Sequence, residues 1–412
     1  MEPAAPPLSL YVHIPWCVRK CPYCDFNSHA QGAGLPVAAY VEALLADLDD
    51  ELRHFEGAIA GRSLHSVFFG GGTPSLFAPD AIARILEGVA ARIDLPREAE
   101  VTLETNPGTI EHGRFDGYLA AGVNRISLGV QSFDDGMLRR LGRIHSADDA
   151  ARALGEAQAA GFTRINLDLM YALPGQDLAG ALADIDRAIA LAPSHVSHYQ
   201  LTVEPNTAFA AHPPPQLPDE DSAWDMQEAC QQRLAQAGYA QYEVSAYARP
   251  RDACVHNLNY WGFGDYLGIG AGAHGKLTDG AGGAIVRTTR RKLPRSYLER
   301  AARGESQRSE TPIAHADLPF EFMMNALRLV DGVPACWFTE RTGLAGEEIA
   351  ATLHTLRQRG WLAHDAGRLV PTSEGRRLLN DLVGAFLPPA PTRRGTLPPV
   401  RVVAPPVPGS EP

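Results

Sequence analysis

The sequence is poor in cysteine, basic side chains and long apolar runs, and each shortage excludes a class of protein. Six cysteines in 412 residues are too few for a disulfide scaffold. Lysine and arginine number 37 against 48 acidic residues, and this charge of −11 argues against general nucleic-acid binding, which needs a basic face. No run reaches the roughly 20 apolar residues of a membrane span. The start lacks the basic and apolar regions of a signal peptide, so we expect a cytoplasmic protein with reduced thiols.

From Leu8 to about residue 250, short β-rich runs alternate with patterns of helical spacing. Apolar residues at helical intervals predict helices at 37–55, 79–93, 111–121, 147–160 and 178–191. The predicted strands are Ser9–Ile14, His65–Phe69, Glu100–Glu104, Arg125–Val130, Thr163–Met170 and His195–Val203. Strands that are each followed by a helix indicate an α/β fold with parallel pairing. Periodicity alone does not separate a (β/α) barrel from an open doubly wound sheet.

Most of these strands run into glycine or polar residues that are able to do chemistry. The segments at their ends are a cysteine cluster, Gly70–Pro74, Glu104–Pro107, Gln131–Ser132 and, within the fifth strand, Asp168. The carboxyl ends of parallel strands in a barrel open onto one face. The sequence therefore predicts one shared site at that face.

The character of the sequence changes after about residue 290. Helical patterns at 316–330, 335–343, 346–359 and 373–386, with a predicted hairpin around Asp365–Gly367, are typical of a winged-helix unit. Such a unit could bind DNA or serve as a packing module, and the acidic balance favours packing.

Nine prolines and no periodicity in 388–412 predict a disordered tail. We therefore expect a (β/α) barrel domain with its extension at 1–290, a helical accessory domain at 291–387, and the tail at 388–412. The length is sufficient for one large domain and a smaller one.

Three of the six cysteines, Cys17, Cys21 and Cys24, lie within eight residues directly after the first strand. Thiolates this close in sequence indicate one metal centre. Zinc would need a fourth ligand, for which His13 or His29 is available, whereas an iron–sulfur cubane accepts three thiolates and leaves one iron open. The spacing does not decide between the two metals. The remaining cysteines, which we expect to be ordinary buried thiols, are Cys230, Cys254 and Cys336.

A C-x-x-x-C-x-x-C loop after the first strand of a (β/α) repeat resembles the radical S-adenosylmethionine (radical SAM) superfamily. This resemblance implies a partial (β/α) barrel and a 4Fe-4S cluster on Cys17, Cys21 and Cys24. It also implies S-adenosylmethionine chelating the fourth iron. Within the superfamily, the oxygen-independent coproporphyrinogen III oxidase group is similar over about residues 8–385. The segments that carry the similarity are Tyr11–Cys17, Gly70–Ser75, Glu104–Pro107, Leu128–Ser132, Leu141–His145 and Asp168–Gln176.

The resemblance also implies roles for the residues that bind the methionyl part of the cofactor. Gly71, Gly72 and Thr73 would let the backbone approach the amino group, where a Cβ would obstruct it. Glu104 would accept hydrogen bonds from cofactor donors. Arg143 would pair with the carboxylate through its planar guanidinium.

Four further residues would complete the cofactor pocket in this interpretation. Asp168 suits the ribose hydroxyls, Tyr23 would line the adenine side, and Tyr11 and Gln131 would close the pocket. Taken singly, the pocket residues have ordinary alternatives: a tight turn for the glycines, surface charges for Glu104 and Arg143, and a helix cap for Asp168. Their shared position at successive strand ends favours a site.

The chain departs from the oxidase pattern at two places. The oxidases extend the motif to a fourth cysteine, C-x-x-x-C-x-x-C-x-C, and Phe26 stands at that position here. Only ten residues precede Tyr11, which leaves little room for the long N-terminal extension of those oxidases. Both departures argue against decarboxylation of porphyrin propionates.

A second motif, His256-Asn-Leu-Asn-Tyr260-Trp261, fits the H-N-x-x-Y-W pattern of the haem-chaperone (HemW-type) branch of this family. An imidazole can ligate haem iron, and Tyr260 and Trp261 offer flat faces to a porphyrin. The ordinary alternative is a structural histidine beside an aromatic pair.

Together with Phe26, this second motif favours a haem-binding protein that delivers haem to acceptors such as respiratory haem proteins. The expected cofactors are a 4Fe-4S cluster, S-adenosylmethionine and haem. No nucleic acid is expected as a partner, and any contact with membrane proteins would be transient. We name no catalytic residue. The alternative is an enzyme, an oxygen-independent coproporphyrinogen III dehydrogenase.

Overall fold

The computed structural model describes residues 5–32, 34–109, 114–279 and 283–388. Of the predicted tail, everything after Pro388 lies outside the described residues. Within the described part, every helix is too short or too polar to cross a lipid bilayer.

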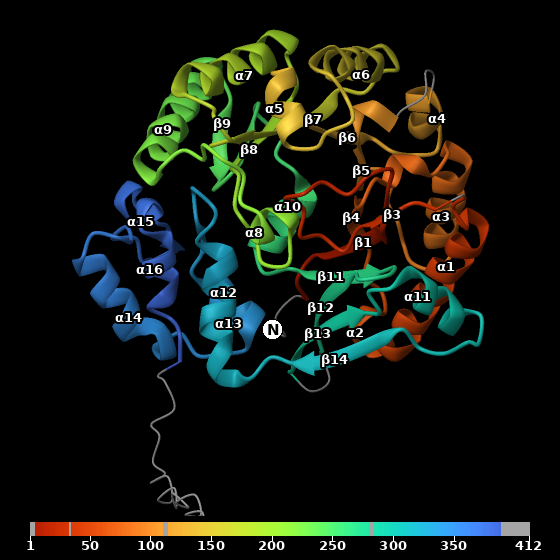
Figure 1. Cartoon of the computed structure of the whole chain (residues 1–412). Helices are drawn as coiled ribbons and strands as arrows, with labels where there is room; N and C mark the ends of the chain where they lie inside the picture. The colour runs from red at the N-terminus through yellow and green to blue at the C-terminus, as the bar shows by residue number, and fades with distance from the viewer. Residues whose placement is uncertain (1–4, 33, 110–113, 280–282, 389–412) are drawn as a thin grey trace, which may run out of the picture.

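A twelve-stranded mixed sheet forms the centre of the molecule, in the order β14-β13-β12-β11-β1-β4-β5-β6-β7-β8-β10-β9 (Figure 1). All of the predicted strands are present and pair in parallel in sequence order. They are β1 (Leu8–Ile14), β4 (Leu64–Gly71), β5 (Glu100–Thr105), β6 (Arg125–Gln131), β7 (Arg164–Tyr171) and β8 (His195–Gln200). This curved parallel sheet with outer helices confirms the predicted α/β partial barrel.

Amphipathic helices cover the outer face of the curved sheet (Figure 1). The predicted ones are found as α1 (Val37–His54), α3 (Pro79–Ala90), α4 (Arg114–Ala120), α6 (Ala147–Ala159) and α7 (Leu178–Leu191). α9 (Glu220–Gln236) packs beside α7. Their apolar residues and the inward strand residues form the largest core, which includes the fully buried Leu10, Tyr40, Phe69 and Leu128. This core fixes the strand ends that carry the site.

An antiparallel extension, which the sequence analysis missed, widens the sheet beyond β1. β11 (Asp265–Ile269) pairs in parallel with β1, and β12 (His274–Thr278), β13 (Ile285–Arg290) and β14 (Arg308–Pro312) follow in antiparallel order. At the other edge, β10 (Ala246–Ala248) and β9 (Ala240–Glu243) continue from β8. The glycine-rich and charged runs of 262–312 lack a clean two-residue alternation, which hid these strands.

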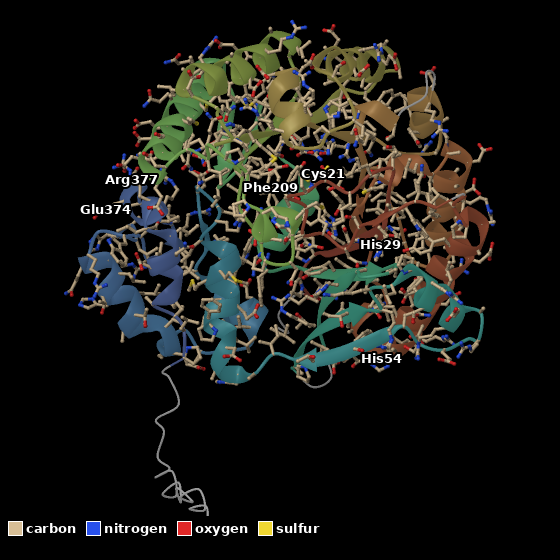
Figure 2. The ribbon with its side chains drawn as sticks, in the orientation of Figure 1. Cys21, His29, His54, Phe209, Glu374 and Arg377 are labelled. Atoms are coloured by element: carbon tan, nitrogen blue, oxygen red, sulfur yellow. The ribbon has the colours of Figure 1, made fainter. Side chains whose placement is uncertain are left out.

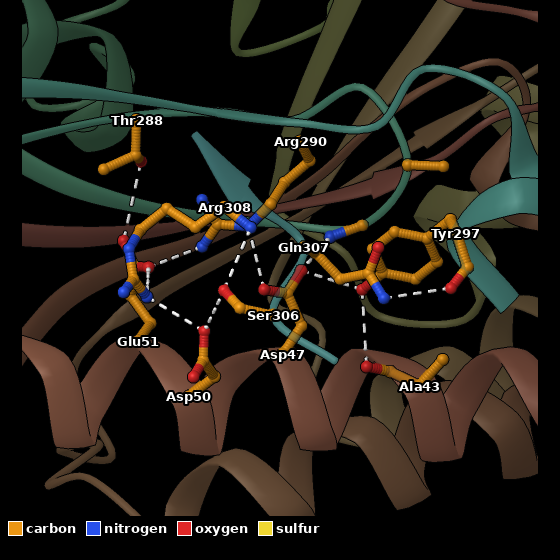
Figure 3. A network of polar contacts seen from close by, with 12 residues as sticks. Ala43, Asp47, Asp50, Glu51, Thr288, Arg290, Tyr297, Ser306, Gln307 and Arg308 are labelled. Carbon is orange, nitrogen blue, oxygen red and sulfur yellow. Dashed lines mark hydrogen bonds and ion pairs between the residues drawn. The ribbon is translucent and has the colours of Figure 1, made fainter. Parts of the chain in front are cut away.

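A buried polar network joins this extension to the barrel (Figure 3). Arg290 at the end of β13 donates to Asp47 at 2.8 Å and to Glu51 at 2.6 Å, both on α1. Tyr297 of α11 (Pro294–Ala301) donates to Asp47 at 2.8 Å, and Arg308 of β14 donates to Asp50 at 2.9 Å. The charged groups of Arg290, Asp47 and Glu51 are fully buried, so these bonds are shielded from competing water.

The C-terminal part forms a second core and matches the predicted winged-helix-like unit. Its elements are α12 (Leu318–Ala326), α13 (Cys336–Thr342), α14 (Glu347–Gln358), α15 (Ser373–Arg377), α16 (Leu379–Gly384), β15 (Val333–Pro334) and β16 (Arg368–Leu369). The two arms of the predicted hairpin pair through an antiparallel bridge between Leu362 and Pro371. β16, in the second arm, also pairs in antiparallel orientation with β15. The division at residue 290 stays a prediction, while the sheet itself continues through β14 at 308–312.

Two predictions for this region are wrong. The last helix is not continuous over 373–386, because Leu378 leaves the helical conformation and separates α15 from α16. Cys336 is exposed at the start of α13 rather than buried, whereas Cys230 and Cys254 are buried as expected.

Candidate functional site

The carboxyl ends of the parallel strands surround one pocket, as the sequence predicted. Nearly all of the predicted cluster and cofactor residues line it: Cys17, Cys21, Tyr23, Cys24, Gly71, Gly72, Thr73, Glu104, Gln131, Arg143 and Asp168. They come from the loop after β1, from the ends of β4, β5 and β6 and the segments that follow β4 and α5 (Asp135–Arg140), and from within β7. The parallel topology therefore brings together residues as far apart in sequence as Cys17 and Asp168, 151 positions.

The cysteine loop is held in place by neighbours on both sides. The N–H of Cys24 donates to the carbonyl of Cys21, with 3.2 Å between N and O, and forms a tight turn. Phe209 of α8 (Ala208–Ala211) donates its backbone N–H to Pro22 at 3.0 Å, and Figure 2 shows Phe209 close to Cys21 near the middle of the molecule. The loop thus has backbone contacts within itself and to α8, and its three thiols are partly exposed.

Two histidines near the cysteine loop could complete a zinc site, and they differ in their contacts. His29 bonds through its Nε2 to Asn27 at 3.3 Å. Both ring nitrogens of His13 have partners, Tyr11 at 3.0 Å and Asn27 at 2.9 Å, so this histidine is not available as a fourth ligand. The donor set of three separate thiols on one pocket wall fits a larger iron–sulfur cluster.

The glycine turn after β4 is needed for close backbone packing. Gly71 has a φ of +117°, and a Cβ there would lie 2.6 Å from the ring of His13. A Cβ on Gly72 would lie 2.5 Å from the carbonyl oxygen of Trp16. Glycine therefore lets the turn lie directly against the cysteine loop. The N–H of Gly71 donates to Glu104 Oε2 at 3.2 Å.

Two buried carboxyl groups face the pocket. Burial, and then the charge of Asp168, raise the pKa of Glu104 to about 8, and the Gly71 N–H offsets this only in part. Burial also raises the pKa of Asp168, although Asn166 and Ser127 donate to its oxygens at 2.8 and 3.1 Å. Two carboxyl groups that burial pushes toward the neutral form favour a ligand carrying positive charge and hydroxyl donors.

Arg143 joins the cysteine loop to β6. Its Nη2 donates to the carbonyl of Gly129 at 2.6 Å, and its Nη1 lies 3.6 Å from the sulfur of Cys21. The buried Nε has no partner among the described residues, so the guanidinium keeps one donor for a bound anion.

Gln131 owes its position to backbone strain at the end of β6. It has a φ of +70° at an irregularity in the β6–β7 register, and its Oε1 accepts a hydrogen bond from Tyr199 at 2.8 Å. Tyr199 lines the pocket too, and the sequence analysis missed it because β8 ends in no recognisable motif. The only signal available was its place in a strand next to the one that carries Asp168.

Tyr11 does not line the cysteine pocket, contrary to its predicted role in closing it. Its hydroxyl bonds to His13, and its ring faces a second cavity whose walls include Tyr260, Tyr266 and His274. Three residues line both cavities: Phe26, Gly71 and Glu104. The two cavities are therefore neighbours that share a wall.

The three predicted haem residues lie on α10 (Val255–Trp261) but face different surroundings. His256 is only 3% exposed, and Tyr260 reaches the second cavity. The ring of Trp261 packs under the guanidinium of Arg328, 4.2 Å from its centre, beside the C-terminal core. The structure therefore does not bring these three side chains to one open face.

Comparison with known proteins decides the family. The family model described as the radical SAM superfamily matches residues 11–188, and that of the HemN C-terminal domain matches 313–378. The protein named heme chaperone HemW of Haemophilus influenzae is 50% identical over 93% of this chain and 99% of its own length. The Escherichia coli protein of the same name is 49% identical over 93% and 98%. The chain belongs to the HemW family of radical SAM proteins.

The solved structure of coproporphyrinogen III oxidase (HemN) from Escherichia coli has the same fold as this HemW-family chain. The TM-score is 0.77 at 25% sequence identity, over 93% of this chain and 90% of the oxidase. The predicted relationship to the oxidase group is thereby confirmed at the level of fold and C-terminal domain. The sharper similarity in sequence is to the HemW proteins.

Proposed function

We propose that this chain is a haem chaperone that binds a 4Fe-4S cluster, S-adenosylmethionine and haem, and delivers haem to acceptor haem proteins. The observation that carries this proposal is the near-complete match at 49–50% identity to two proteins named heme chaperone HemW. The sequence identity to the oxidase is only 25%, although the two proteins share the fold. Phe26 in place of the oxidases' fourth cysteine supports the same choice.

In this proposal, Cys17, Cys21 and Cys24 hold the cluster, and the remaining iron is open to S-adenosylmethionine. When bound, this cofactor pair supplies one-electron reduction of the sulfonium. The described residues provide a fitting pocket: Arg143 has a free donor for the carboxylate, and Glu104 and Asp168 favour positive charge and hydroxyl donors. The chain's own contribution is to position the cofactor and keep the cluster loop rigid.

The partners follow from the same proposal. Acceptors such as respiratory haem proteins would receive the haem, with transient contact to membrane proteins, and the protein would work in the cytoplasm. No nucleic acid is proposed as a partner, since the chain carries a net charge of −11.

The test is anaerobic reconstitution of the cluster in the full chain, followed by haem titration and by transfer to an apo-haem protein. We expect tight haem binding and transfer. No haem binding would contradict the proposal. Formation of protoporphyrinogen from coproporphyrinogen III in an anaerobic assay would instead establish the oxidase alternative, which the shared HemN fold makes worth measuring.

A further inference from the structure

The second cavity, beside the cysteine pocket, has walls suited to a large planar ligand. Tyr260 and Tyr266 stack on each other with ring centres 4.1 Å apart and planes 29° apart, and both line the cavity. Phe26 is 63% exposed at the wall shared with the cysteine pocket. Tyr266 is buried and Tyr260 partly exposed, so the tyrosine pair forms a flat aromatic wall inside the cavity and Phe26 extends it at the edge.

The mouth of this cavity carries further apolar surface and a positive charge. Asn27 donates through its Nδ2 to the carbonyl of Lys292 at 2.8 Å, which brings the end of the cysteine loop against the segment after β13. Phe26 and Leu293 therefore flank this bond, and at 63% and 64% they are the most exposed large apolar residues described. Lys292 lines the same cavity and is exposed. The cavity lining also includes the carboxyl groups of Asp25 and Glu104, so among the described residues Lys292 is its one lysine or arginine and marks the side of the rim that suits a ligand carboxylate.

His274 offers the cavity an available imidazole. It is exposed at the first position of β12, it lines the cavity, and its side chain makes no hydrogen bond to another described residue. The backbone of His274 packs directly against Gly268. A Cβ on Gly268 would come within 1.9 Å of the His274 carbonyl oxygen, so only glycine permits this approach. A fixed backbone with a free ring suits a ligand position for iron.

His256 differs from His274 in being buried: its Nε2 also has no partner among the described residues, but the side chain is 3% exposed and does not line the cavity. Its Nδ1 is bonded to Ser66 at 2.9 Å, and its ring stacks on Phe68 with centres 4.9 Å apart. Its ring also lies 4.8 Å from that of Tyr260, so it supports the cavity wall from behind. An iron atom in the cavity could reach His256 only if this buried packing opened.

We propose that haem binds in the second cavity with His274 as an axial ligand of the iron. The macrocycle lies against Tyr260, Tyr266 and Phe26, and the Lys292 ammonium pairs with a propionate. His256 is a positioning residue behind Tyr260. This inference rests on the proposed function, since it specifies where the cargo binds and which atom holds it.

The test is haem titration of the full chain, followed by the Soret absorption and by resonance Raman spectra of the iron–ligand modes. The variants are His274→Ala and His274→Met, with His315→Ala as the matched control, because His315 is an exposed histidine in the C-terminal part whose side chain is 72% exposed. We expect His274→Ala to weaken haem binding at least tenfold. His274→Met is expected to bind haem with a changed axial-ligand signature, and the control is expected to match the wild type.

The results separate the two proposals. If the wild type binds haem and His274→Ala and His274→Met leave affinity and spectrum unchanged, the assignment of His274 is wrong while the chaperone proposal stands. If the wild type itself binds no haem, the proposed function fails first. Circular dichroism and iron content of each variant show whether the fold and cluster are retained, and the changed spectrum of His274→Met requires a folded protein.

Discussion

The Nδ1 atom of His256 lies 2.9 Å from the hydroxyl oxygen of Ser66, inside the fold. The same hydroxyl donates to Ser9 at 2.8 Å, so the bond ties α10 to β4 and β1. The backbone N–H of His256 donates to Glu100 at 3.0 Å, which adds a fourth element. The histidine of the predicted haem motif is thus an anchor between the helix and the sheet.

The buried contacts of His256 predict that replacing it lowers the stability of the fold even when no haem is present. His256→Ala removes a buried ring and leaves the Ser66 hydroxyl without this partner, so we expect the free energy of unfolding to fall by about 2–4 kcal/mol. Urea denaturation of the protein without haem measures this. His315→Ala, at an exposed position, should change stability by less than about 0.5 kcal/mol. An unchanged stability for His256→Ala would contradict the anchoring role.

The buried network of α1 predicts a large effect at Arg290. Arg290→Met leaves the carboxylates of Asp47 and Glu51 buried without their main cation, and we expect a loss of about 3–5 kcal/mol in the free energy of unfolding. Denaturant titration of both proteins measures the difference.

The matched control for Arg290 is Arg84→Met, which breaks an ion pair to Glu42 whose two side chains are 50% and 70% exposed. Surface pairs contribute about 0–1 kcal/mol, so this variant should stay near the wild type. Equal effects of the two substitutions would show that the buried network adds nothing to stability.

The raised pKa of Glu104 predicts that the free energy of unfolding of the cofactor-free protein depends on pH. The pKa is about 8 in the fold against 4.5 ordinarily, so between these values the folded state binds the proton that the unfolded state has released. Stability should therefore fall as pH rises from about 5 to 8 and level off above that range. Glu104→Gln should remove this component and be more stable than the wild type at pH 8.5, by at most about 5 kcal/mol for the full shift.

Denaturation curves at pH 5, 7 and 8.5 for the wild type and Glu104→Gln test this difference. Glu98→Gln, an exposed carboxylate two residues before β5, is the control and should follow the wild type at each pH. Parallel pH profiles for the wild type and Glu104→Gln would show that the buried carboxyl has no unfavourable ionisation.

The two hydrogen bonds of the Asn27 side chain predict that its removal makes the end of the cysteine loop more mobile. Its Nδ2 donates to the carbonyls of Ala271 and Lys292 at 2.8 Å each, so Asn27→Ala frees the cysteine loop from both walls of the second cavity. Amide hydrogen exchange in 25–30 and 271–274 should become faster by a factor of about 10. Asn325→Ala removes only a bond within α12 and should leave these segments unchanged.

The sequence was sufficient to predict the parallel strands and most of the cysteine pocket. Motifs that sit at strand ends share a face in any parallel barrel, so Cys21, Glu104 and Arg143 could be placed together without coordinates. The surroundings of His256 were not predictable, because its partner Ser66 is 190 residues away and belongs to no motif. The proposed ligand His274 could not be predicted for a similar reason, since it begins a strand whose alternation is broken by glycine.

The wall shared by the two cavities has a thermodynamic consequence. Phe26, Gly71 and Glu104 face both spaces, so a ligand that shifts them in one cavity changes the free energy of binding in the other. Such a coupling is reciprocal: whatever factor the sulfonium cofactor applies to cargo affinity, cargo applies to cofactor affinity. Under the proposed function, a change in cofactor occupancy would therefore change how tightly haem is held.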